Sequence, residues 1–193
     1  MTDAKHDLHV YLREGRAALL WKLDGLSEYD VRRPLTPTGT NLLGLVKHMS
    51  TVQLLTLGWV FDRHFTEPVA WFQRDLPPNT DMWALPEESR AYVIGVYEKA
   101  SAHADATIAA LDPDTRGNMP WLGDADGRPT LIRAMAHVVA ELQRHLGQAD
   151  IVRELVDGSA GLYAHTPFLP DGDAAWWADH RERVERAAKE ADA

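Results

Sequence analysis

Apolar residues recur at the spacing of an α-helix in four segments of the chain, and no segment alternates apolar and polar residues as a half-buried strand would. The four segments extend over about residues 3–26, 38–65, 86–111 and 130–158. Amphipathic helices bury their apolar stripes most simply against one another. The pattern therefore predicts an all-α protein whose fold is a four-helix bundle.

The connections between these helices are long. Residues 66–86 are rich in proline, aspartate and aromatic side chains, which predicts an ordered crossover rather than a flexible linker. The second helix is expected to open near residues 38–40, where a threonine can cap it, and the last long helix to begin at Thr130 and to end at Gly158. We expect a bundle domain over residues 1–160 and a C-terminal extension over residues 161–193, which packs on the bundle or trails from it and contains a short helix.

Composition removes several classes of function. The formal net charge of -9 argues against a general electrostatic partnership with nucleic acid or an anionic membrane. The chain has no cysteine, which excludes disulfides, thiolate metal ligands and a cysteine nucleophile, so any thiol chemistry needs an external thiol. Residues 1–7 lack the features of a signal peptide, and no apolar run approaches the ~20 residues of a transmembrane helix. We expect a cytoplasmic protein.

The helix predicted over residues 130–158 carries ionisable residues on its apolar side. His145 continues the apolar stripe, and Glu141 precedes it by one helical turn, so both side chains are aimed toward the bundle interior. His137 lies a further turn before Glu141 and is a candidate to hydrogen-bond it or to relay protons. A buried carboxylate requires a positive partner. An ion pair of Glu141 with His145 on the helix surface would also fit this spacing.

His48 offers a partner from another helix. It follows the apolar run of residues 42–46, on a helix that otherwise buries itself. Together with Glu141 and His145 it would give nitrogen and oxygen ligands for a divalent ion, with a coordination position left for water or substrate. Zinc, nickel, manganese and iron(II) all remain open. A hydrogen-bonded core histidine is the ordinary alternative.

Two further residues are candidates for binding a ligand beside such a site. Trp59 is one of four tryptophans that could line the mouth of a pocket, with Trp71, Trp83 and Trp121. Arg144 could attract an acidic group of a ligand. Packing under the crossover and simple exposure to water are the alternatives for these side chains.

Two segments of the chain resemble a known family. Residues 39–48, Gly-Thr-Asn-Leu-Leu-Gly-Leu-Val-Lys-His, are similar to the second-helix motif of the DinB-like superfamily, and residues 137–150 are similar to its fourth-helix motif. The resemblance covers residues 5–158. It implies an up-up-down-down four-helix bundle with a divalent metal at one end, usually in a homodimer.

The metal ligands that this resemblance implies are His48, Glu141 and His145. A glutamate in the middle position is similar to the mycothiol-dependent maleylpyruvate isomerase and mycothiol S-transferase type, in which two histidines and a glutamate hold zinc. That type implies transfer of mycothiol, or a similar small thiol, to an electrophilic small molecule. About 35 residues follow Gly158, fewer than the additional domain of the isomerase, so we expect thiol transfer.

Two alternatives to thiol transfer stay open. The chain could be a non-catalytic scaffold or stress-related bundle whose metal site is structural or vestigial. It could also be a metal-dependent hydrolase that uses water in place of the thiol.

Overall fold

The computed structural model describes residues 4–73, 75–120, 127–163 and 168–192. Apart from an isolated antiparallel bridge between Arg116 and Thr130, the regular secondary structure of these residues is helical. The elements are α1 (Ala4–Trp21), α2 (Glu28–Arg32), α3 (Leu42–Thr56), the 3₁₀ helices η1 (Trp59–Phe61) and η2 (Thr80–Met82), α4 (Arg90–Ala110), α5 (Leu131–Asp157) and α6 (Ala174–Ala191). The prediction of an all-α protein is confirmed.

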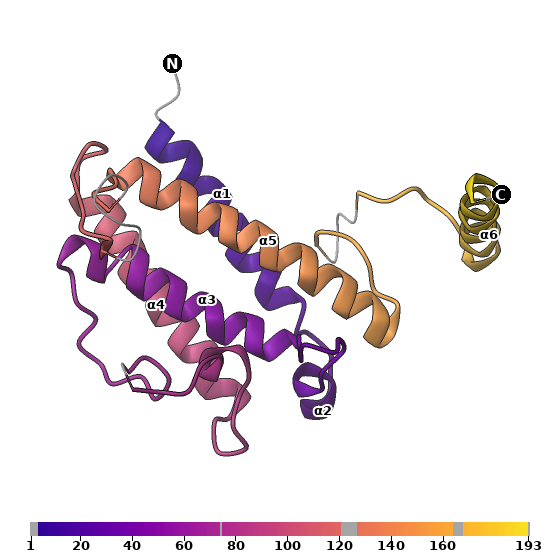
Figure 1. Cartoon of the computed structure of the whole chain (residues 1–193), viewed down its shortest axis with the longest axis horizontal. Helices are drawn as coiled ribbons and strands as arrows, with labels where there is room; N and C mark the ends of the chain where they lie inside the picture. The colour runs from indigo at the N-terminus through magenta and orange to yellow at the C-terminus, as the bar shows by residue number, and fades with distance from the viewer. Residues whose placement is uncertain (1–3, 74, 121–126, 164–167, 193) are drawn as a thin grey trace.

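Four long helices, α1, α3, α4 and α5, pack together, with α1 against α5 and α3 against α4 (Figure 1). Lys5 at the start of α1 donates a hydrogen bond to the carbonyl of Leu111 after α4, whereas Arg90 at the start of α4 donates to the carbonyl of Leu26. The helices α1 and α4 are therefore antiparallel. In Figure 1, α5 runs alongside α1 in the same direction, and α3 runs alongside α4.

This order of directions, up-down-down-up, corrects the up-up-down-down arrangement that the family resemblance implied. The reason lies in the connections. Residues 22–41 turn the chain back, so that α3 runs opposite to α1. The longer stretch of residues 57–89 returns along the bundle, so that α4 starts at the same end as α3. A crossover of this length is what two consecutive parallel helices need.

The helix ends follow local capping chemistry. The side chain of Asn41 accepts a hydrogen bond from Gly44 N at 2.8 Å, so α3 begins after Asn41 rather than at the threonines before it. Ser89 caps α4 in the same way, three residues beyond the predicted start at Pro86. Thr130 caps α5, and Gly158 ends it with a left-handed backbone at φ 78°, so this helix begins and ends where the sequence predicts.

The predicted apolar stripes form the core. The stripe of α5 is buried from Leu131 to Val152, and Leu12, Leu19 and Leu23 of the α1 segment are buried beside it. Burying one such side chain contributes about 1.5–3 kcal/mol, so the packing of α1 on α5 stabilises the bundle.

The crossover is fastened to α3 by a buried ion pair. The Lys47 side chain, fully buried, donates hydrogen bonds to Glu88 Oε2 at 2.7 Å and to the carbonyl of Trp83 at 2.8 Å. Asn41 donates to the carbonyl of Met82. The crossover segment before α4 is thus ordered on the bundle, as predicted, and it has a fixed position relative to α3.

The C-terminal helix differs from the others because none of its residues is buried. In Figure 1 it lies beyond the end of α5, and residues of both helices, Glu154 and Trp177 among them, line one cavity. Trp176 and Trp177 contact each other and His180. The division into a bundle and an extension stays a prediction. Within the described parts of the chain, no helix is both long and apolar enough to cross a bilayer.

Candidate metal centre

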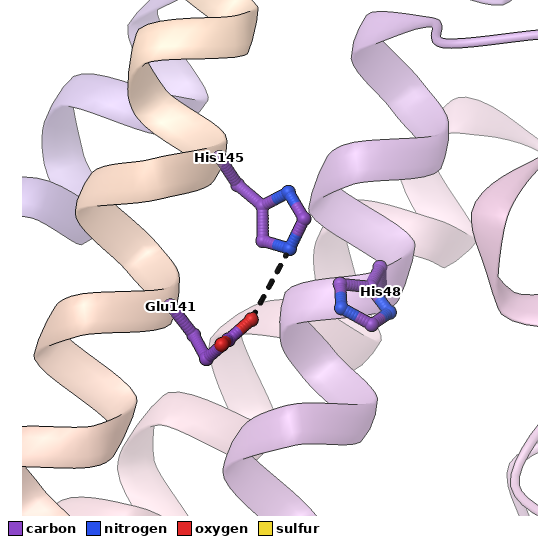
Figure 2. Close-up of side chains that lie close together, drawn as sticks. All are labelled: His48, Glu141 and His145. Carbon is purple, nitrogen blue, oxygen red and sulfur yellow. Dashed lines mark ion pairs between the residues drawn. The ribbon is translucent and has the colours of Figure 1, made fainter. Parts of the chain in front are cut away.

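Three side chains from two helices converge at one place in the bundle (Figure 2). His48 comes from α3, and Glu141 and His145 come from successive turns of α5. One ligand atom from each lies within 4.8 Å of the other two. The His48 and His145 rings are 4.7 Å apart, edge to face. The three residues that the sequence selected are therefore brought together.

His48 is oriented by an acid from the crossover. Its Nδ1 lies 2.8 Å from Asp81 Oδ2, and because a carboxylate only accepts, Nδ1 donates and Nε2 is the ring nitrogen left for a metal. Burial raises the pKa of Asp81, but the hydrogen bond and charge of His48 outweigh it, so the pKa lies below its usual 3.8. Asp81 therefore remains an ionised acceptor at neutral pH.

His145 is oriented by its own helix. Its Nδ1 lies 2.7 Å from Gln148 Oε1, three residues later, so Nδ1 donates and Nε2 is again left with a lone pair. The side chain is buried, with 7% of its surface exposed. Burial is the main cause that lowers the pKa of His145, and it outweighs the Gln148 hydrogen bond, which raises it. His145 is therefore neutral at neutral pH, the form that binds a metal.

This set of donors fits a divalent ion. The two imidazoles offer Nε2, and Glu141 Oε2 lies 3.6 Å from His145 Nε2, too far for a hydrogen bond between them. Ligand atoms at about 2.0–2.2 Å from a common ion lie about 3–4 Å from each other. Imidazole and carboxylate ligands without sulfur suit zinc, nickel, manganese and iron(II) alike.

The candidate metal site opens onto a cavity of about 540 Å³, here called the metal-site cavity. Arg144, exposed on α5, lines it together with Trp83 and the hydroxyl-bearing Thr38 and Thr40. The predicted ligand-binding role of Arg144 is thus compatible with its position. A small molecule in this cavity would lie against the ligand atoms and meet hydrogen-bonding groups.

The other predicted site residues lie elsewhere. Trp59 is 40% exposed and lines a neighbouring cavity, with its ring 6.0 Å from that of His64. His137 is exposed on α5 and lines neither cavity. Trp71 also lines the neighbouring cavity, and Trp121 is outside the described residues.

Sequence reasoning missed the two residues that orient the histidines. Gln148 could have been found, because it lies three residues after His145 and therefore on the same side of the helix. Asp81 could not, because it belongs to an irregular segment whose path depends on the contacts of Lys47 and Asn41 with the crossover.

A comparison with curated proteins gave no match. A scan against protein-family models matches residues 7–158 to the family described as mycothiol-S-transferase. The matched range contains α3, α4 and α5, α1 from its fourth residue, and the three candidate ligands. The chain therefore belongs to the mycothiol S-transferase family, a DinB-like family.

Proposed function

We propose that this chain is a divalent-metal-dependent enzyme that transfers a small thiol of the mycothiol type to an electrophilic small molecule. The observation that carries the proposal is the convergence of His48, Glu141 and His145 beside an open cavity. The family match supports the thiol as co-substrate. Zinc is the metal we expect.

The residues of the chain have separate tasks in this proposal. His48, Glu141 and His145 would hold the ion, which when bound would favour the thiolate form of the thiol at neutral pH. Asp81 and Gln148 keep the imidazoles in the tautomer that presents Nε2.

The groups that line the metal-site cavity would bind the body of the thiol. Arg144 donates hydrogen bonds to its oxygen atoms, and the threonine hydroxyls of the cavity add further partners. His137, one turn before Glu141 at the surface, is assigned a proton relay between the site and water.

The open cavity favours catalysis over a structural metal site. A structural site normally has a complete set of protein ligands, whereas a catalytic site leaves a position for water or substrate. Here the described residues offer three ligands next to a cavity. A hydrolase would have the same geometry, and only the dependence of turnover on thiol separates it from a transferase.

The test combines metal analysis with calorimetry and turnover. We expect purified native protein to hold close to one ion per chain, and His48→Ala and Glu141→Gln to lose it. The exposed His6 and Glu154 supply the matched controls His6→Ala and Glu154→Gln, which should keep the metal. The metal-loaded protein should bind mycothiol more tightly than glutathione and consume an electrophile only when thiol is added. Turnover without thiol, or metal retained in both ligand variants, would contradict the proposal.

A further inference from the structure

A second cavity lies beside the metal-site cavity. It also measures about 540 Å³ and lies between α3, η1 and the crossover; we call it the apolar cavity. Asp81 lines the apolar cavity, while its hydrogen-bond partner His48 lines the metal-site cavity. Asn79 lines both. The two cavities therefore meet at the pair of residues that sets the orientation of a candidate ligand.

The lining of the apolar cavity is chemically different from that of its neighbour. Most of the described lining residues are aliphatic or aromatic, among them Leu54, Leu55, Trp59, Phe65, Phe72 and Leu76. The ionisable groups among them are Asp81, already paired with His48, and His64, paired with Asp62. A charged ligand would lose its hydration here without gaining an opposite charge from these residues. The cavity is of the size that holds small organic molecules, and it suits an uncharged one.

Two buried polar atoms belong to residues of this lining. Trp71 Nε1 and Thr51 Oγ1 are shielded from water and have no hydrogen-bond partner in the described part of the chain. Trp71 is 4% exposed, with Lys47 Nζ 4.8 Å from its ring centre and the Tyr92 ring edge-on at 5.5 Å. A buried donor without a partner is unfavourable, so a ligand oxygen that reaches either atom after a rotation of its side chain gains affinity there.

Thr51 and Trp71 belong to the part of the lining that adjoins α3 next to His48. Thr51 follows His48 by three residues on α3, which places it one turn away on the same side of the helix. Trp71 is next to Lys47, the residue before His48. A ligand oxygen bound at these atoms therefore brings the adjacent carbon atoms of the ligand close to the wall shared with the metal-site cavity.

We infer that the apolar cavity binds the electrophile, and that this electrophile is an uncharged aromatic α,β-unsaturated ketone. The inference rests on the proposed thiol transfer. The aromatic ring occupies the part lined by Leu55, Phe72 and Trp59, and the carbonyl oxygen accepts hydrogen bonds at Trp71 and Thr51. Addition fits better than displacement, because the described lining offers no cation to a departing anion.

The reaction of this class balances without a further reactant. The thiolate sulfur forms a bond to the β-carbon, and the π electrons of the carbon–carbon double bond move toward the carbonyl oxygen. The α-carbon then takes up the proton that the thiol lost, which gives a saturated thioether ketone. No oxidant, reductant or leaving group is involved.

The experiment separates binding from turnover. The probe for binding is 4-phenylbutan-2-one, a saturated ketone that thiols cannot attack, measured by calorimetry with the metal-loaded protein. 4-Phenylbutanoate, of similar size but anionic, is the control ligand. The probe for turnover is the corresponding enone, 4-phenylbut-3-en-2-one, with mycothiol.

The variant Leu55→Trp fills the apolar cavity, and Leu155→Trp is its matched control at a position 61% exposed on α5. We expect Leu55→Trp to weaken binding of the saturated ketone by at least about tenfold, which is 1.4 kcal/mol, and Leu155→Trp to leave it unchanged. Thr51→Val, which removes one donor at nearly constant volume, should weaken it less. Metal content and mycothiol affinity should be unaffected in all three variants.

Each result has a defined meaning. Equal binding of ketone and carboxylate, or ketone binding that survives both Leu55→Trp and Thr51→Val, overturns the inference. If Leu55→Trp unfolds, Thr51→Val and the charged Leu76→Glu still decide it. Ketone binding without thiol-dependent turnover contradicts the proposed function and keeps the cavity as a ketone site. Turnover of small polar electrophiles that Leu55→Trp leaves intact overturns the cavity assignment and keeps the function.

Discussion

Gly44 is the position at which a single methyl group should weaken the candidate metal site without touching a ligand. It lies in the first turn of α3, where the backbone of the crossover at Met82 packs against the helix. A Cβ at Gly44 would lie 1.9 Å from the carbonyl oxygen of Met82 and 2.6 Å from its carbonyl carbon. Both atoms are backbone, so no side-chain rotation relieves the clash. The substitution Gly44→Ala must therefore push the crossover away from α3.

The size of the effect follows from these distances. Because Cβ contacts under 3.0 Å essentially do not occur, the Met82 carbonyl must retreat by about 1 Å. Asp81 precedes Met82, and its 2.8 Å hydrogen bond to His48 would then exceed the range of a hydrogen bond. Losing such a partner of a metal-binding histidine typically costs about 10–100-fold in metal affinity. Overpacking lowers the free energy of unfolding by about 1–3 kcal/mol, whereas replacing glycine by alanine in a helix raises it by about 0.5–1 kcal/mol. The net effect of Gly44→Ala is therefore destabilising.

Gly95 provides the matched control. It lies inside α4, and a Cβ there meets nothing within 4 Å. Gly95→Ala should therefore raise the free energy of unfolding by about 0.5–1 kcal/mol and leave the metal affinity unchanged. The assays are zinc titration against a chromophoric chelator and urea unfolding of the metal-free protein. A Gly44→Ala protein that binds zinc as tightly as the wild type, and unfolds at the same or higher urea concentration, would refute the reasoning.

Three further changes test the contacts around the site. Gln148→Leu removes the acceptor of the His145 Nδ1 proton and should lower zinc affinity about 10–100-fold in the same chelator titration, with unchanged urea unfolding. Lys47→Met leaves the buried Glu88 carboxylate without its cation and should lower the free energy of unfolding by about 3–5 kcal/mol, measured with urea at pH 7. A decrease of less than about 1 kcal/mol would contradict a buried ion pair. The hydrogen bond from Arg153 is the main cause that lowers the pKa of Asp157 below its usual 3.8, so the stabilising contribution of this acid is complete above that pH and is lost as the pH falls through the lowered pKa. The free energy of unfolding of the wild type should exceed that of Asp157→Asn by about 1 kcal/mol at pH 7, and the difference should shrink as the pH falls below 3.8, whereas a pH-independent difference would exclude the linkage.

The candidate metal site was predictable because its residues lie on periodic elements. His145 falls on the apolar stripe of α5, Glu141 is one turn away, and His48 is embedded in the apolar part of α3. Helical periodicity fixes which side chains point toward the bundle interior, and it places the buried His145 and the half-buried His48 and Glu141 there. The family resemblance then indicated that His48 of α3 binds the same ion as Glu141 and His145 of α5.

The irregular parts were not predictable in the same way. Apolar periodicity is identical for a helix that runs up or down, so the direction of α3 relative to α1 depends on the path of the connections. The position of Asp81 depends on a buried ion pair between residues 41 positions apart, Lys47 and Glu88. Such a contact leaves no periodic signal in the sequence. The roles of Trp59 and Arg144 stay predictions, and that of His137 has less geometric support because it is exposed and lines neither cavity.

The crossover is the element that links the two cavities. It supplies Asp81 to His48, and Asn79 lines both cavities. Lys47 fixes this segment at the carbonyl of Trp83, and Asn41 fixes it at the carbonyl of Met82. A ligand in the apolar cavity that displaces Asp81 must therefore change the affinity for the ion, and by linkage the ion must change the affinity for that ligand by the same factor. The coupling requires no movement of the long helices, because the shared wall between the cavities is a short segment held in place by Lys47 of α3 and by Asn41, which caps that helix.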